Sequence, residues 1–206
     1  MNHGYDKFIA ISNHNILKTS ISGEESFTPE SAWYDAYLAQ IEKIASLNVS
    51  AIVLREKDLS EESYCLLAKK CIEICKRHNT RLILHNFLDT ALSLDHPYIH
   101  LPLYKLEECQ NSHILTRFQT IGTSVHSVED ALLAEKLGAD YLFAGNIYET
   151  DCKAGLPGRG LNFLRDVCKK TSLPVYAIGG MNTDRLESAI QSGAAGACMM
   201  SGFMKL

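Results

Sequence analysis

The segment LPVYAIGGMNTDRLESAIQSGAAGACMM spans residues 173–200 and is predicted to contain a complete strand–helix–strand unit. Residues 173–180 form an apolar run that ends in two glycines, the pattern of a buried strand followed by a turn. Residues 182–191 are predicted to form a helix, and residues 195–200 are a second apolar run. Two strands joined by a helix indicate a parallel sheet.

The same alternation of short apolar runs and amphipathic stretches continues over the rest of the chain. Further strands are predicted at 8–12, 51–55, 81–85, 98–102, 119–124 and 140–145. Further helices are predicted at 31–47, 60–78, 88–94, 104–117, 127–137 and 161–170. Eight strands separated by helices predict an α/β protein, a small TIM (β/α)₈ barrel with a truncated last helix, as a single domain over residues 1–206. An open doubly wound sheet is the structural alternative.

Composition and charge narrow the class of protein. Of the 206 residues 46% are apolar and 21% charged, and the net charge is −4. This mild acidity argues against a nucleic acid or an anionic membrane as partner. The seven cysteines include no CxxC pair, so we expect reduced thiols and no metal ligation by cysteine. Neither a signal peptide nor a membrane-spanning apolar run is visible, so the expected location is the cytoplasm.

Candidate binding residues fall where the predicted strands end, which is where TIM barrels place their active sites. Arg55 and Lys57 follow the second strand, and their charges suit a phosphate or a carboxylate. A solvated charge run together with Glu56 and Asp58 is an equally good explanation of this pattern.

Small residues follow the last two strands. Gly179 and Gly180 come after the seventh strand, and Ser201 and Gly202 after the eighth. Glycines let backbone N–H groups approach an anion, and a helix N-terminus adds a favourable dipole. These two turns therefore predict a phosphate site, with simple tight turns as the alternative.

Two polar loops are candidates for function. The glycine-rich stretch 144–160 follows the sixth strand, and its Thr150 and Lys153 are placed to position or enclose an anion. Its length and charge favour a functional loop over a connector. Residues 13–30 are long enough to form a mobile lid.

Three histidines, His85, His100 and His126, lie at neighbouring strand ends. Histidine side chains in general can donate and accept protons near neutral pH, so His126 in TSVHS is a candidate acid/base residue, although a lone histidine is often structural. No carboxylate accompanies the three in a metal-binding motif, so no metal site is predicted from them.

At these motifs the sequence resembles the thiamine phosphate synthase and TenI superfamily of small TIM barrels. The resemblance runs from Phe8 to Met204, with its most specific stretches at 121–161 and 174–202 and an LREK segment that begins at Leu54. The SVHS and TDCK-G-GRG motifs are more similar to TenI than to the synthase.

The two branches of this superfamily differ in their use of metal. The resemblance implies that the synthase couples a pyrimidine pyrophosphate to a thiazole phosphate with Mg²⁺ held by two aspartates after strands three and four. Asn86 and Lys105 occupy those positions here, and Phe87 replaces the arginine of the first motif. A neutral amide and a cation cannot replace two anionic oxygen ligands. The synthase is therefore the less favoured alternative, and Mg²⁺ is expected only if it holds.

The resemblance to TenI then implies a thiazole tautomerase, an isomerase that aromatises a carboxythiazole phosphate by proton transfer without a cofactor. His126 would be its acid/base residue. The residues implied in substrate binding are Arg55, Lys57, His100, Thr150 and Lys153, and those implied in phosphate binding are Gly179, Gly180, Ser201 and Gly202. A non-catalytic, regulatory thiazole-phosphate-binding protein is a third alternative. Apolar surface exposed beside the short last helix would imply a homodimer or another partner.

Overall fold

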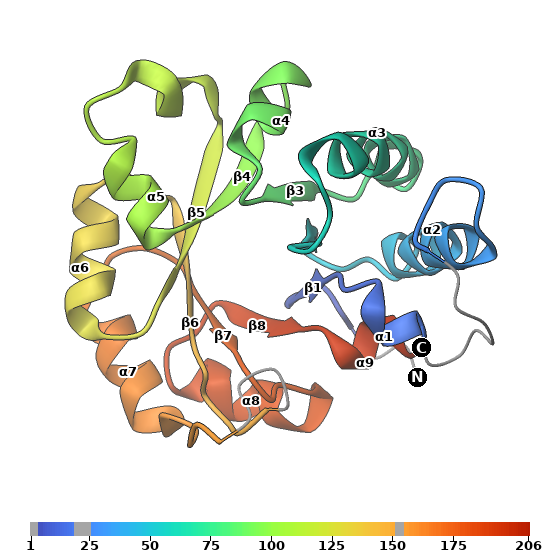
Figure 1. Ribbon diagram of the computed structural model, residues 1–206. Helices are drawn as coiled ribbons and strands as arrows, with labels where there is room; N and C mark the ends of the chain where they lie inside the picture. The colour runs from blue at the N-terminus through green and yellow to red at the C-terminus, as the bar shows by residue number, and fades with distance from the viewer. Residues whose placement is uncertain (1–3, 19–25, 151–154) are drawn as a thin grey trace. The chain divides into compact units, whose positions relative to one another are not determined.

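A computed structural model describes residues 4–18, 26–150 and 155–206 of the chain (Figure 1). Its strands follow chain order, β1 to β8, in a closed parallel barrel, so the predicted TIM-barrel fold is confirmed. The chain divides into two compact units, residues 1–94 with 200–206 and residues 95–199. The expectation of a single domain over 1–206 stays a prediction. Among the described residues, no helix is both long and apolar enough to cross a membrane.

The first unit contains three parallel strands and the helices that accompany them. The strands are β1 (Phe8–Ile11), β2 (Ala51–Leu54) and β3 (Leu82–His85). The helices are α1 (Asn15–Lys18), α2 (Ala32–Ala45), α3 (Glu61–Arg77), α4 (Leu88–Ser93) and α9 (Ser201–Met204). All twelve strand residues are buried, as expected of parallel strands that are covered on both faces.

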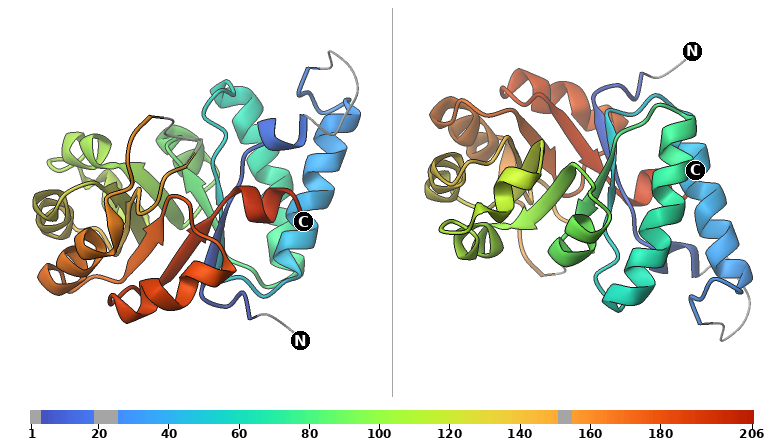
Figure 2. Two further views of the ribbon diagram at one scale, coloured as in Figure 1. Left: turned by 90° about the horizontal axis from the view of Figure 1, so that it is seen from below. Right: turned by 90° about the horizontal axis from the view of Figure 1, so that it is seen from above.

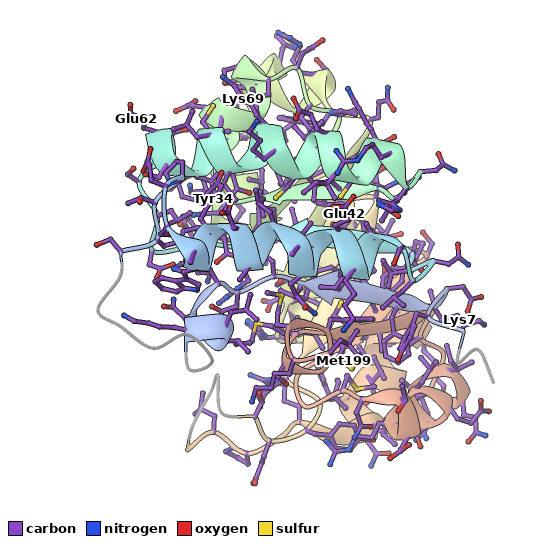
Figure 3. The ribbon with its side chains drawn as sticks, turned by 90° about the vertical axis from the view of Figure 1, so that its right-hand side faces the viewer. Lys7, Tyr34, Glu42, Glu62, Lys69 and Met199 are labelled. Carbon is purple, nitrogen blue, oxygen red and sulfur yellow. The ribbon has the colours of Figure 1, made fainter. Side chains whose placement is uncertain are left out.

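Helices α2 and α3 lie side by side in both views of Figure 2. Each begins at a serine cap: the Ser31 hydroxyl accepts from the Tyr34 N–H, and the Ser60 hydroxyl accepts from the Ser63 N–H. Tyr34 of α2 lies between the two helices (Figure 3) and is buried. The fully buried Tyr64 of α3 ties the helix to the sheet, because its hydroxyl donates to the Leu54 carbonyl (2.7 Å) and accepts from the His85 N–H (2.9 Å).

The last helix, α9, has only four residues, as expected from the sequence. Its Phe203 is fully buried and packs edge-on against Tyr5 and Phe8, with ring centroids 5.2 and 6.1 Å away. Gln40 of α2 donates from Nε2 to the Phe203 carbonyl (2.6 Å). One helical turn is therefore enough to anchor the end of the described chain to the first unit.

The second unit contains five parallel strands, which pair in chain order. They are β4 (Tyr98–Pro102), β5 (Thr120–Val125), β6 (Tyr141–Gly145), β7 (Val175–Ile178) and β8 (Gly196–Met199). The helices are α5 (Leu103–Glu108), α6 (Val128–Lys136), α7 (Gly160–Lys170) and α8 (Thr183–Gln191), with a 3₁₀ turn at His113–Arg117.

Two elements of this unit differ from the sequence prediction by more than one residue at an end. The helix expected at 104–117 is broken into α5 and the 3₁₀ turn, because the Ser112 hydroxyl donates to the Cys109 carbonyl and competes with continued helix. The strand expected at 173–180 is reduced to Val175–Ile178. Its C-terminal end is set by Gly179 and Gly180, whose φ angles of 96° and 63° are incompatible with a strand.

Candidate active-site groups at the strand ends

Glu56 is the buried centre of a polar group that follows β2 in the first unit, with 1% of its surface exposed. Its Oε1 accepts from the hydroxyls of Ser12 (2.5 Å) and Tyr37 (2.8 Å). Its Oε2 accepts from the backbone N–H (3.0 Å) and Nδ1 (2.6 Å) of His14. Four donors satisfy the carboxylate, which is what a buried anion requires. The interpretation of residues 55–58 as a solvated charge run is therefore wrong for Glu56.

The two predicted cations flank Glu56 in the sequence. Arg55 is half-buried, and its backbone N–H donates to the Ser12 hydroxyl (2.9 Å), which itself donates to Glu56. Lys57 is exposed. Burial, reinforced by the charge of Glu56, raises the pKa of Tyr37 well above its usual value, so this hydroxyl stays a donor. Arg55 and Lys57 thus extend from a backbone segment that is fixed by internal hydrogen bonds.

His14 connects Glu56 to Asp58. Its Nε2 lies 3.5 Å from Asp58 Oδ2, and its ring stacks on Phe27 with centroids 4.3 Å apart. Burial tends to raise the pKa of Asp58, but the hydrogen bond from Asn15 and the charges of His14 and Arg55 outweigh it, so this pKa is lowered. The flanks of the predicted lid at 13–30 are therefore packed at His14 and Phe27, while residues 19–25 lie outside the described part of the chain.

The geometry of His14, Glu56 and Asp58 also bears on metal binding. One ligand atom from each lies within 4.8 Å of the others. Both oxygens of Glu56 already accept from protein donors, which leaves His14 Nε2 and one carboxylate, Asp58, as ligands. This falls short of the three or four protein ligands of a zinc site and of the oxygen-rich shell of magnesium. The group is better explained as a hydrogen-bonded anchor for the loops after β1 and β2.

The positions at which the family resemblance implies magnesium ligands are not carboxylates. Asn86 follows β3 with a φ of 70°, a left-handed conformation that asparagine tolerates better than most residues. Lys105 is half-buried in α5 of the second unit. A neutral amide and a cation do not fit a magnesium site.

His100 of β4 is the centre of a polar group inside the second unit, with 1% of its surface exposed. Its Nε2 lies 2.9 Å from the Ser124 hydroxyl and its Nδ1 lies 3.1 Å from the Tyr141 hydroxyl. Its ring stacks on Phe143, with centroids 4.2 Å apart. Branched aliphatic side chains commonly fill barrel interiors. The hydrogen-bonded group around His100 is polar and aromatic instead, so it differs from an ordinary barrel core.

His126 lies just beyond β5 and is exposed. Its Nδ1 is 2.7 Å from the Gly145 carbonyl, and its backbone N–H donates to Asp130 Oδ2 (2.8 Å). A carbonyl can only accept, so Nδ1 carries a proton and Nε2 is the ring nitrogen that can meet a ligand.

The glycine turn after β7 packs closely against the loop after β6. A Cβ on Gly179 would lie 2.5 Å from the Asn146 Cβ, and one on Gly180 would lie 2.6 Å from the Glu149 carbonyl oxygen. The Tyr148 N–H donates to the Gly179 carbonyl (3.1 Å). Both glycines are thus required by the packing of two loops, and their contact with phosphate stays a prediction.

The remaining predicted residues are only partly described. Thr150 is half-buried, and Lys153 lies outside the described residues. Ser201 and Gly202 are exposed in α9 of the first unit, whereas Gly179 and Gly180 belong to the second. The joint use of the two turns by one phosphate therefore stays a prediction.

Sequence reasoning missed Ser12, His14 and Tyr37 as partners of Glu56, and it missed Tyr141 as a partner of His100. Ser12 and His14 follow the first strand just as Arg55 follows the second, so the rule that selected strand ends could have found them. Tyr37 and Tyr141 lie inside a helix and a strand, where the sequence indicates burial but not the partner.

Comparison with known proteins places this arrangement in a family. Residues 26–203 match the family whose description is thiamine monophosphate synthase. The chain belongs to this family. A thiamine-phosphate synthase of Caldanaerobacter subterraneus is 34% identical over 80% of this chain and 78% of its own length. Thiamine-phosphate synthase 2 of Streptococcus pneumoniae serotype 4 is 31% identical over 83% of this chain and 81% of its own length.

A solved structure agrees with the fold of this family member. A thiamine phosphate pyrophosphorylase from Pyrococcus furiosus superposes with a TM-score of 0.76 at 24% sequence identity. The match covers 99% of this chain and 90% of the other. At this identity the likeness supports the TIM-barrel fold alone.

The predicted thiazole tautomerase, an isomerase, is wrong. The similar curated relatives are named thiamine-phosphate synthases, and their similarity extends over about four fifths of the chain, whereas the TenI-like motifs are short. Magnesium is one way to stabilise the negative charge of a leaving pyrophosphate. A cationic side chain, such as that of Arg55 or Lys57, can serve the same electrostatic purpose.

Proposed function

We propose that this family member is a thiamine-phosphate synthase, a transferase that joins a pyrimidine pyrophosphate to a thiazole phosphate and releases pyrophosphate. The observation that carries the proposal is the 31–34% identity, over about four fifths of each chain, to relatives that bear this name. Both substrates are phosphorylated small molecules, in agreement with cationic and glycine-rich strand ends.

The reaction requires stabilisation of negative charge more than proton transfer. The thiazole nitrogen supplies the electron pair of the new C–N bond to the pyrimidine methylene carbon. The electron pair of the broken C–O bond leaves with the pyrophosphate. Charge therefore grows on the leaving oxygen, and positive groups held in place before the reaction stabilise it most effectively.

Arg55 and Lys57 are the residues we assign to the pyrophosphate. The guanidinium of Arg55 can bind two phosphate oxygens at once, and Lys57 adds a compact charge. Their backbone is held by the Ser12 and Glu56 hydrogen bonds, so little reorganisation is needed when substrate binds.

Residues of the second unit are assigned to substrate binding. We assign the thiazole phosphate to the backbone of Gly179 and Gly180, which precede α8, while Ser201 and Gly202 of the first unit stay predicted phosphate-binding residues. Thr150 and Lys153 would line the same ligand, and His126 would offer Nε2 to it. His100 is buried, so we assign it an indirect role through Ser124.

A coupling assay with purified protein tests the proposal. The protein is mixed with both substrates, and thiamine phosphate and pyrophosphate are quantified with Mg²⁺ and with EDTA. We expect both products in equal amounts and only with both substrates present. If neither product forms with Mg²⁺ present while a known synthase is active in parallel, the proposal is wrong. The EDTA arm separately determines whether a chain with Asn86 and Lys105 needs the metal.

The proposal also includes a cytoplasmic location. The six cysteines that the structure describes are all free, in agreement with a reducing compartment. A homodimer is the oligomeric state we expect, and sedimentation of the purified protein tests it.

A further inference from the structure

We propose that Tyr141 is a positioning residue, which fixes the tautomer of His100 so that Ser124 directs its hydroxyl proton toward a phosphate oxygen of the substrate. The inference rests on the proposed function for the identity of that anion. The arrangement itself rests on three side chains of the second unit, from the neighbouring strands β4, β5 and β6.

Strand register shows how far along the strands each of these side chains lies, from the interior of the unit to the C-terminal strand ends. His100 pairs with Gly122, and Ser124 pairs with Pro102, the last residue of β4. His100 and Tyr141 are buried, whereas Ser124 is half-buried. Ser124 is therefore the member of the group that lies nearest the C-terminal strand ends, where barrel enzymes bind their substrates.

The order of acidity decides where the protons lie. A phenol, with a pKa of about 10, is a stronger donor than an alcohol, and an imidazole nitrogen is a stronger acceptor than a hydroxyl oxygen. Tyr141 therefore donates to Nδ1 of His100. A neutral imidazole carries one proton, which is then on Nε2 and is donated to the Ser124 oxygen.

This tautomer has a consequence for Ser124. Because its oxygen accepts from His100, its own proton cannot be given to the ring and is directed to another acceptor. A hydroxyl fixed as a donor suits an anionic oxygen, and charge-assisted hydrogen bonds of this kind are the stronger ones. Without the Tyr141 hydroxyl, the ring can change tautomer and accept from Ser124 instead.

The surrounding residues hold this geometry. The His100 ring stacks on Phe143 with an interplanar angle of 24°. The Tyr141 ring occupies the space beside Gly122, where any side chain at position 122 would collide with its Cζ and hydroxyl. The Tyr141 ring also packs edge-on against Tyr176 with centroids 6.1 Å apart. Loss of the hydroxyl alone therefore leaves the ring packing unchanged.

The test compares Tyr141→Phe with Ser124→Ala and with a control, Tyr34→Phe, which removes the hydroxyl of a buried tyrosine between α2 and α3 (Figure 3). Nitrogen-15 NMR of the histidine rings reports the tautomer of His100. We expect the Nε2–H tautomer in the parent protein and a shift toward Nδ1–H in Tyr141→Phe alone. Isothermal titration with inorganic pyrophosphate and with inorganic phosphate should show about tenfold weaker binding of the preferred anion in Tyr141→Phe and Ser124→Ala.

The two substitutions act on one hydrogen bond, so their combination should weaken binding no further than either alone. An unchanged His100 tautomer in Tyr141→Phe overturns the inference. Anion binding by Tyr141→Phe that equals that of the parent protein also overturns it. These readouts do not require turnover. Failure of the coupling assay with the expected NMR and titration results would therefore remove the proposed reaction and leave the role of Tyr141 standing.

Discussion

Nδ1 of His14 lies 2.6 Å from Oε2 of Glu56, and this contact ties the loop after β1 to the loop after β2. Glu56 also accepts from the His14 backbone, so a single carboxylate fixes both the ring and the main chain of the residue. The stacked Phe27 ring holds the other side of His14. A glutamate that is almost fully buried and accepts four hydrogen bonds is therefore an organising element of the first unit.

Replacement of Glu56 by Gln should destabilise the protein by about 2–4 kcal/mol, because it removes a buried charge and leaves donors of His14 facing an amide. Urea unfolding at neutral pH measures the effect. Asp58→Asn is the matched control: its side chain is 56% exposed, so its loss should cost at most about 1 kcal/mol. Equal stabilities of the two variants would contradict the anchoring role of Glu56.

Replacement of Gly179 by Ala should be costly for two separate reasons. Its φ of 96° is unfavourable for a residue with a Cβ, and that Cβ would lie 2.5 Å from Asn146. Gly138 has a similar φ of 85°, but nothing lies within 4 Å of a Cβ at this position. Gly138→Ala should therefore show only the cost of the left-handed backbone conformation, about 1–2 kcal/mol. Thermal unfolding should show a larger loss for Gly179→Ala than for Gly138→Ala. Equal losses would mean that the loops can separate without cost.

Local pattern predicted the fold well because strands and helices of a barrel are short, regular and alternate. The strand at 98–102 agrees at both ends, and the helix at 60–78 differs by one residue at each end. The errors fall where side chains compete with the backbone, as at Ser112, or where consecutive glycines end a strand, as after Ile178.

The candidate site could be predicted only in part. The strand-end rule selected Arg55, His100 and His126 from position alone. It left a solvated charge run that includes Glu56 as an equal alternative, because burial of a carboxylate depends on donors that lie about forty residues away, such as Ser12. The activity could not be predicted from the short motifs and the lost metal ligands, because the similarity that indicates a synthase extends over about four fifths of the chain.

Tyr34 gives a prediction for alkaline pH. Burial, with added repulsion from Cys71 and Asp35, raises its pKa to about 12. The folded protein therefore holds this proton more tightly than the unfolded chain, whose tyrosines have the ordinary value of 10.0. The resulting stability is fully present below pH 10 and is lost as pH rises from 10 to 12.

Urea unfolding of the parent protein and of Tyr34→Phe at about pH 9, 10, 11 and 12 measures this effect. Phenylalanine does not titrate, so the variant lacks the contribution of residue 34. The free energy of unfolding should fall more steeply for the parent than for the variant over that range. Below pH 10 the two curves should run parallel. Curves that stay parallel up to pH 12 would show that Tyr34 does not resist ionisation.

Substitution of Lys57 by Met should lower kcat/KM for coupling by about 10²-fold or more, the usual loss when a group that stabilises developing charge is removed. Lys57 is exposed, so the free energy of unfolding should change by at most about 0.5 kcal/mol. Arg55→Lys keeps the charge and removes the planar fork, and it should also lower kcat/KM if two phosphate oxygens are bound together. Lys69→Met on the exposed face of α3 is the control for loss of one positive charge (Figure 3). If Lys57→Met and Lys69→Met have the same kcat/KM, then Lys57 does not stabilise the leaving pyrophosphate and is only a solvent-exposed surface charge.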